Sequence, residues 1–166
     1  MKKIKLSKGK FTLVDDSDFG WLNQWKWCCD SKGYASRSEK ISETGRKKRK
    51  FISMAREIMK TPNGIFIDHK NHDKLDNRKI NLRNCSASDN MRNRVVAKNC
   101  KSGYKGVWWN NKRQRWVAYI KHSGRSWILK HCKTKEEAAE VYNREAKKLF
   151  KEFSYPNKVK YNDLCR

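Results

Sequence analysis

The sequence predicts an α+β fold in two parts. Short apolar runs alternate with turn residues through residues 1–97, apolar and polar side chains alternate through residues 104–132, and one long amphipathic helix follows. The 166 residues allow one domain or two small ones, and 37% hydrophobic against 35% charged residues favour two modest cores. We therefore predict domains at 1–97 and 104–158, a linker at 98–103 and a tail at 159–166.

The first 60 residues are expected to form two β-hairpins and two short helices. "KIKLSKGKFTLVDD" is typical of two strands around a turn at Lys8-Gly9, and "DFGWLNQWKW" carries apolar residues at helical spacing. "GYASRS" and "KFISM" predict a second hairpin, closed by a basic run that includes residues 46–50. "MAREIMK" predicts a short helix that Pro62 ends.

Residues 61–97 predict the order strand, polar loop, strand, helix. "GIFIDHK" and "INLRNC" are short strand patterns on either side of a loop rich in Asp, His and Asn. "SASDNMRNRVVA" predicts a helix, because Ser86 suits the N-cap and Asp89, three residues later, suits a capping box.

Residues 104–158 predict a three-stranded antiparallel sheet packed on one helix. The strand patterns are "YKGVWWN", "RWVAYIKH" and "RSWILKHC", and Thr134 is expected to cap the helix "TKEEAAEVYNREAKKLF". In the second strand Trp116, Ala118 and Ile120 share one face, which we expect to cover the helix. The opposite, open face would carry Arg115, Val117, Tyr119 and Lys121.

The charge of the chain indicates a polyanionic partner. Forty-one Lys and Arg against 17 Asp and Glu give a formal net charge of +24, spread along the whole length. Such a surface attracts nucleic acid. An anionic membrane is the rival partner, but no amphipathic basic helix or membrane-spanning stretch is evident. Seven Trp, six Tyr and six Phe argue against disorder.

The cysteines do not form a zinc-binding pattern. None of the six makes a C-x-x-C pair, so no zinc ribbon is expected. The N-terminal "MKKIKLSKGK" lacks the apolar segment of a signal peptide. We therefore expect reduced thiols and a cytoplasmic protein.

The Asp-His-Asn cluster in "DHKNHDKLDNRKINLR" suits the hydrolysis of a phosphodiester. That reaction needs a base for the attacking water, which His69 could supply, and a hard divalent ion near the scissile phosphate. Asp68 and Asn90 offer oxygen ligands for such an ion. Asn81, on the second strand, could hydrogen-bond His69 and fix its orientation.

These residues resemble the motif of the HNH endonucleases, particularly the homing enzymes of phages. The resemblance rests on Asp68-His69, "D-N-R" at 76–78, "N-L-R" at 81–83 and Asn90-x-x-Asn93. It implies a ββα-metal module, of two strands and a helix around one metal, at about residues 61–97. It also implies one divalent ion, Mg²⁺ or Mn²⁺. His69 would be the general base with Asn81 orienting it, Asp68 and Asn90 would bind the metal, and Arg78, Arg83 and Asn93 would contact DNA. The family often has glycine where this chain has His72, which indicates a loop residue; a phosphate contact is the lesser alternative.

The C-terminal part resembles the Apetala-type, or ethylene-response-factor, DNA-binding domain. The resemblance runs from Gly103 to Asn157 and includes the "Y-K-G-V" start, the "EEAA..Y" helix and the closing Asn. That family reads the DNA major groove with its sheet, although the plant factors carry arginines where this chain has Trp108 and Asn110. The positions implied to meet DNA are Lys105, Asn110, Arg113, Arg115, Tyr119, Lys121 and Lys130.

The two resemblances together predict a phage homing-type endonuclease that cuts double-stranded DNA in the host bacterial cytosol, with no obligate protein partner. The alternative is a DNA-binding regulator with a degenerate HNH module. Ala55, where the family often has histidine, favours this alternative, whereas the presence of Asp68, His69, Asn81 and Asn90 favours the enzyme. The basic run at 46–50 is either a phosphate contact or a solvated hairpin tip.

Overall fold

The computed structural model divides into two compact units, Met1–Asn90 and Met91–Arg166. It describes residues 1–43, 46–97 and 99–160. Both units mix helices and strands, which confirms the α+β class. The first unit ends before residue 97, where we predicted the domain to end; residue 98 of the predicted linker and residues 161–166 of the predicted tail lie outside the described residues.

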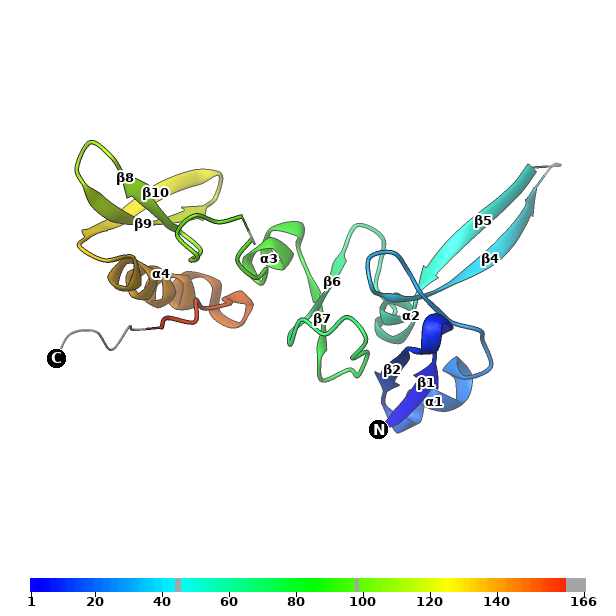
Figure 1. The fold of residues 1–166 in the computed structure, drawn as a ribbon. Coiled ribbons are helices and arrows are strands. Elements are labelled where there is room, and N and C mark those ends of the chain that lie inside the picture. The colour runs from blue at the N-terminus through cyan, green and yellow to red at the C-terminus, as the bar shows by residue number, and fades with distance from the viewer. Residues whose placement is uncertain (44–45, 98, 161–166) are drawn as a thin grey trace. The chain divides into compact units, whose positions relative to one another are not determined.

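The first unit opens with a hairpin and a short helix (Figure 1). β1 (Lys2–Lys5) pairs antiparallel with β2 (Phe11–Val14). A 3-10 turn, η1 (Ser7–Gly9), joins the two strands with Lys8 and Gly9 at positive φ, as the Lys8-Gly9 turn predicts. α1 (Asp16–Leu22) follows at once.

A three-stranded antiparallel sheet comes next, in the order β3-β4-β5. Its strands are β3 (Cys28–Cys29), β4 (Ala35–Glu43) and β5 (Arg46–Ser53). The basic run at 44–50 was expected to close this hairpin. For residues 46–50 that expectation is wrong, because their backbone belongs to β5 and pairs with β4. A run of long side chains can pair as a strand because its backbone hydrogen bonds do not depend on their charge. The predicted closing residues 44–45 lie outside the described part.

Residues 61–92 give the predicted order of strand, loop, strand and helix. After α2 (Met54–Met59), β6 (Phe66–His69) pairs antiparallel with β7 (Leu82–Cys85). Ser86 is confirmed as the N-cap of α3 (Ala87–Arg92), because its Oγ accepts from the Asp89 amide at 3.1 Å. The Asp89 carboxylate accepts from the Ser86 hydroxyl at 2.6 Å. The helix was expected to reach residue 97 but ends at Arg92. The β-branched pair Val95-Val96 beyond this point disfavours a longer helix.

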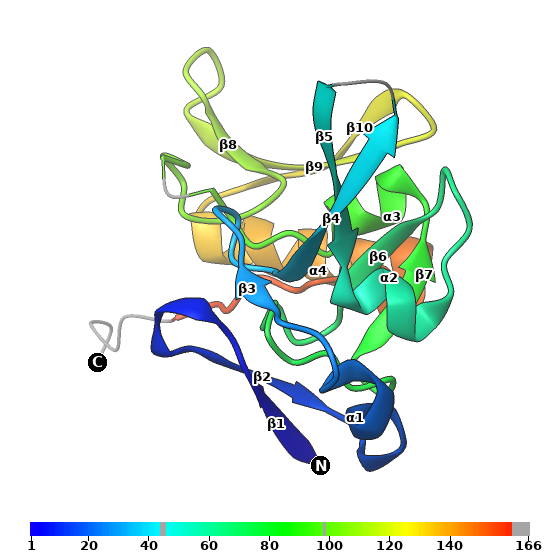
Figure 2. The same cartoon turned by 90° about the vertical axis from the view of Figure 1, so that its right-hand side faces the viewer.

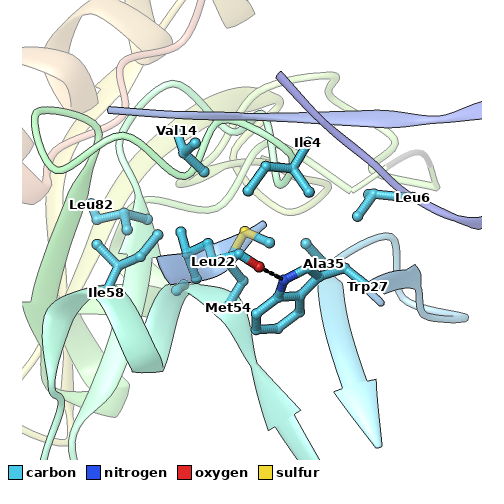
Figure 3. Packing of buried hydrophobic residues seen from close by; sticks show 10 residues of the cluster. Ile4, Leu6, Val14, Leu22, Trp27, Ala35, Met54, Ile58 and Leu82 are labelled. Carbon is cyan, nitrogen blue, oxygen red and sulfur yellow. Dashed lines mark hydrogen bonds between the residues drawn. The ribbon is translucent and has the colours of Figure 1, made fainter. Parts of the chain in front are cut away.

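One apolar core joins the β1–β2 hairpin, the helices α1 and α2, and β7 (Figure 3). Trp27 is buried in it and its indole Nε1 donates to the Leu22 carbonyl at 2.8 Å. This bond satisfies the one polar group that the indole brings into the core. The buried residues of this cluster are Ile4, Leu6, Val14, Leu22, Trp27, Ala35, Met54, Ala55, Ile58 and Leu82.

The second unit contains the predicted three-stranded sheet and helix. β8 (Val107–Asn110), β9 (Arg115–His122) and β10 (Arg125–Cys132) are antiparallel in the order β10-β9-β8. α4 (Lys135–Phe150) lies across one face of this sheet (Figures 1 and 2), and a 3-10 turn, η2 (Lys151–Phe153), follows it. The predicted cap is confirmed, because Thr134 Oγ1 accepts from the Glu137 amide at 3.1 Å.

The sheet and α4 meet through small and apolar residues. Ala118 and Ile120 of β9 are buried as expected, together with Ala138, Ala139 and Tyr142 of α4. Gly106 makes this approach possible: it has φ +69° and a Cβ there would collide with the Tyr142 ring. Val117 was expected on the open face but is fully buried, because its cross-strand neighbours Trp108 and His131 are large.

No helix in the described ranges is long and apolar enough to cross a membrane.

Candidate active site

Asp68 and His69 stand at the end of β6 and are both 6% exposed. They pair in register with Arg83 and Leu82 of β7. Arg83 reaches Asp68 Oδ2 with its Nε at 2.8 Å and its Nη2 at 2.6 Å. The predicted metal ligand and one predicted DNA contact therefore form a largely buried ion pair.

Asn81 closes the polar loop between the two strands. Its Nδ2 donates to the Asp76 carbonyl at 2.7 Å, and its Oδ1 accepts from the Asn71 amide at 3.0 Å. The backbone adds a bond from the Lys70 amide to the Asn81 carbonyl at 3.0 Å. Asn81 is 5% exposed, so both of its side-chain bonds are shielded from water. The amide thus fixes the path of the loop that follows His69.

Asp76 is a buried carboxylate inside this loop, 2% exposed. Arg78 grips it in a bidentate manner, with Nε to Oδ1 and Nη2 to Oδ2 both at 2.7 Å, and Asn71 Nδ2 donates at 2.9 Å. These hydrogen bonds, led by those from Arg78, lower the pKa of Asp76. Arg78, predicted as a DNA contact, therefore has a structural partner. His72 turns the loop at φ 65°, a conformation that favours glycine and suits a loop residue.

A hydrogen-bond partner of the His69 ring is Asn77, which the sequence analysis did not single out. The ring Nε2 lies 3.3 Å from Asn77 Oδ1, whereas the side-chain bonds of Asn81 go to Asp76 and Asn71. Asn81 was expected to make the contact that orients His69. In the structure Asn77 makes this contact instead. Asn77 is the middle residue of the "D-N-R" motif. Whether its side chain points toward His69 depends on the fold of the loop, which the sequence pattern does not show.

A tyrosine from the first unit's sheet region also meets the His69 ring. The ring centroid of Tyr34 lies 5.7 Å from that of His69, tilted by 50°. Burial lowers the pKa of His69, against the opposing effects of the Asn77 hydrogen bond and of nearby carboxylates. The neutral imidazole, which is the form that can accept a proton, is therefore favoured.

The two residues expected to bind a metal carry oxygen atoms, the donors that a hard divalent ion prefers. Asp68 offers carboxylate oxygens, and Asn90, half-buried on α3, offers an amide oxygen. The neighbouring thiol of Cys85 has its pKa raised to about 11, first by burial and then by the charge of Asp68, so it stays protonated and is a poor soft-metal ligand. Within the described ranges no group of three His, Cys, Asp or Glu side chains could hold a metal ion.

The predicted DNA contacts in the second unit divide into outward and inward groups. Arg115 and Lys121 of β9 are exposed, and Tyr119 between them is half-buried. Lys130 is also exposed, but it pairs with Glu137 at 2.8 Å. Lys105 is turned inward: its Nζ donates to the Arg92 carbonyl at 2.6 Å, where burial lowers its pKa to about 8.

The remaining predicted contacts are tied to their surroundings. Asn110 Oδ1 accepts from the Arg113 amide at 3.1 Å and so closes the β8–β9 turn. Arg113 Nη1 lies 3.2 Å from His131 Nε2, and Asn93 is only 4% exposed. Exposed aromatic residues that were not proposed as contacts also lie on this sheet, Trp108 at 42% and Trp127 at 55%.

Comparisons with known proteins agree on one family. A family model described as HNH endonuclease matches residues 60–92, the segment that holds Asp68, His69, Asn81 and Asn90. The chain is also 30% identical, over 155 residues, to a protein of Acanthamoeba polyphaga mimivirus described as an uncharacterized HNH endonuclease. That alignment covers 93% of this chain and 78% of the viral protein. No solved structure matches the chain significantly.

The lowered pKa of His69 predicts a pH-dependent stability in chelator-containing buffer. The unfolded chain binds a proton near the ordinary histidine pKa of about 6.5, while the folded ring resists it. The free energy of unfolding should therefore keep its full value above about pH 6.5. It should fall as the pH drops from there toward the lower pKa that His69 has in the folded protein. Urea denaturation followed by tryptophan fluorescence measures this. His69→Gln, which does not titrate, should flatten the dependence; an unchanged slope in the variant contradicts the assignment.

Proposed function

The chain belongs to the HNH endonuclease family, and we propose that it hydrolyses DNA with one divalent metal ion and His69 as the general base. The observation that supports this proposal is that His69 is buried at the end of β6, directly after Asp68. The loop that follows is fixed by Asn81, and Asn77 contacts the His69 ring. HNH nucleases generally use a divalent metal.

The proposed reaction assigns a role to each group. His69 takes a proton from water, the water oxygen attacks phosphorus, and the bond from phosphorus to the leaving oxygen breaks. The leaving oxygen takes up a proton from a second water molecule. Asp68 and Asn90 would hold the ion, preferably Mg²⁺, which when bound neutralises charge on the phosphate and the leaving oxygen. Asn81 supports this chemistry by closing the loop, and β6, β7 and α3 are the elements we assign to a ββα-metal module.

We assign the second unit to holding the DNA, as an Apetala-type domain. A three-stranded sheet with exposed Arg115 and Lys121 and one supporting helix suits that role. Asn157, the closing residue of the resemblance, accepts from the Lys105 amide at 2.7 Å and donates to the Lys105 carbonyl at 3.0 Å. A homing-type role in a phage-infected bacterium remains our proposal for the biological setting; the viral origin of the relative is in keeping with a mobile viral gene.

Plasmid cleavage tests the catalytic assignment. His69→Ala should abolish cutting of supercoiled plasmid in Mg²⁺ while DNA affinity stays nearly intact, because 41 Lys and Arg share the binding. His72→Gly is the matched control: it removes a histidine from the same loop, relaxes a positive φ and should keep cutting. Chelator should stop the wild type, and Asp68→Ala should need more Mg²⁺.

Cutting by His69→Ala at the wild-type rate would rule out His69 as the base. A wild type that binds DNA but leaves it intact under all metal conditions would favour the non-cleaving regulator.

The salt dependence of binding tests the second unit. Replacing Arg115 and Lys121 by Ala should flatten the slope of log affinity against log salt by about 0.9 for each phosphate that the variant no longer neutralises. Lys147→Ala with Lys148→Ala removes the same charge from exposed positions of α4 and is the control. Equal changes in the two double variants would contradict a specific role for the β9 face.

A further inference from the structure

We propose that Thr12, in β2 and outside the segment matched by the family model, positions His69 through Asn77 by fixing which ring nitrogen carries the proton. Thr12 and Asn77 are positioning residues, and the inference rests on the proposed role of His69 as general base. Three side-chain hydrogen bonds support it: Thr12 to Leu75, Asn77 to Thr12, and His69 to Asn77.

The first contact fixes the direction of the chain of hydrogen bonds. Thr12 Oγ1 lies 2.6 Å from the Leu75 carbonyl oxygen. A carbonyl can only accept, so the single hydroxyl hydrogen of Thr12 is committed to it. Toward any other partner the hydroxyl can then only accept.

The second contact therefore fixes the orientation of the Asn77 amide. Asn77 Nδ2 donates to Thr12 Oγ1 at 2.8 Å, and this leaves Oδ1 as the atom that faces His69. A flipped amide would set Oδ1 against the hydroxyl oxygen, with no hydrogen between them. Thr12 thus discriminates between the two ends of an otherwise ambiguous side chain.

The third contact fixes the tautomer of the ring. Asn77 Oδ1 has no hydrogen, so His69 Nε2 must donate the one in the 3.3 Å contact. In the neutral ring Nδ1 then holds the lone pair and is the atom that can accept a proton from water. The opposite tautomer would place two lone pairs against each other where water cannot intervene.

Burial makes this arrangement selective. Thr12 is 0% exposed, Asn77 2% and His69 6%, so solvent does not compete for these bonds. The backbone holds both ends, because the Leu13 amide donates to the Leu75 carbonyl and the Asn77 amide to the Leu13 carbonyl, each at 2.8 Å. Thr12 and Val14 both lie on the buried face of β2. A buried hydroxyl is costly unless it forms hydrogen bonds, so the threonine at this position is explained by the bonds that it makes.

The test reads the tautomer directly. Long-range ¹H–¹⁵N spectra of the imidazole rings, recorded above the ordinary histidine pKa and without metal or DNA, distinguish a protonated Nε2 from a protonated Nδ1. His69→Gln assigns the His69 signals among the four histidines. We expect protonated Nε2 in the wild type, mixed tautomers in Thr12→Val, and the wild-type pattern again in Thr12→Ser, which keeps the hydroxyl.

Single-turnover cleavage supplies the second readout. Thr12→Val should lower the rate roughly tenfold or more with little change in DNA affinity, because an imidazole in the wrong tautomer is a poor base. Thr12→Ser should recover most of the rate. Val14→Ala, a buried neighbour in β2 without a polar contact, measures the loss that comes from weakened packing alone.

The outcomes separate this inference from the proposed function. An unchanged tautomer in Thr12→Val overturns the inference, whatever happens to cleavage, and leaves His69 as the proposed base. A slow Thr12→Val that Thr12→Ser does not rescue, or that Val14→Ala equals, also overturns it. Full cleavage by His69→Ala would instead remove the proposed base, even if the tautomer behaves as expected.

Discussion

Hydrogen bonds between β2 and residues 75–77 hold the candidate base in place, and the chemistry proposed for the site depends on them. The loop from Lys70 to Asn81 offers little to an apolar core: Leu75 packs against it, but Ile80 is 76% exposed. Polar contacts must therefore fix its path. The Leu13 backbone forms hydrogen bonds with Leu75 and Asn77, on either side of Asp76. The Asn81 side chain donates to the Asp76 carbonyl within the same loop. A buried polar network of this kind specifies one geometry as long as each member is satisfied.

The placement of charge explains why so basic a chain concentrates aspartate at one place. Asp68 and Asp76 are buried, and each is bound by an arginine of the same segment, Arg83 and Arg78. A buried carboxylate without such a partner would be costly. Residues 68–83 carry five Lys and Arg against three Asp, so the segment is net positive, which suits an anionic phosphate. A metal bound at Asp68 would share that carboxylate with Arg83.

Local sequence signals predicted most of the helices, strands and turns. The partner of His69 and the burial of Val117 depend on long-range contacts, which these signals do not show. The turn at Lys8-Gly9 and the caps at Ser86 and Thr134 follow from the chemistry of a few neighbouring residues, so the sequence sufficed. The contact of Asn77 with His69 accompanies a bond from Asn77 to Thr12, which lies far away in the chain and gives no local signal. Val117 lies on the predicted face, yet its cross-strand neighbours bury it.

The single-turnover cleavage rate of Asp76→Asn tests the central claim that a buried polar loop positions His69. The substitution keeps the size of the side chain but removes the charge that Arg78 grips. The account predicts a loss on the order of a hundredfold, because a base displaced by about 1 Å loses that much, with DNA binding retained. A folded Asp76→Asn protein that cuts DNA at the wild-type rate would contradict it.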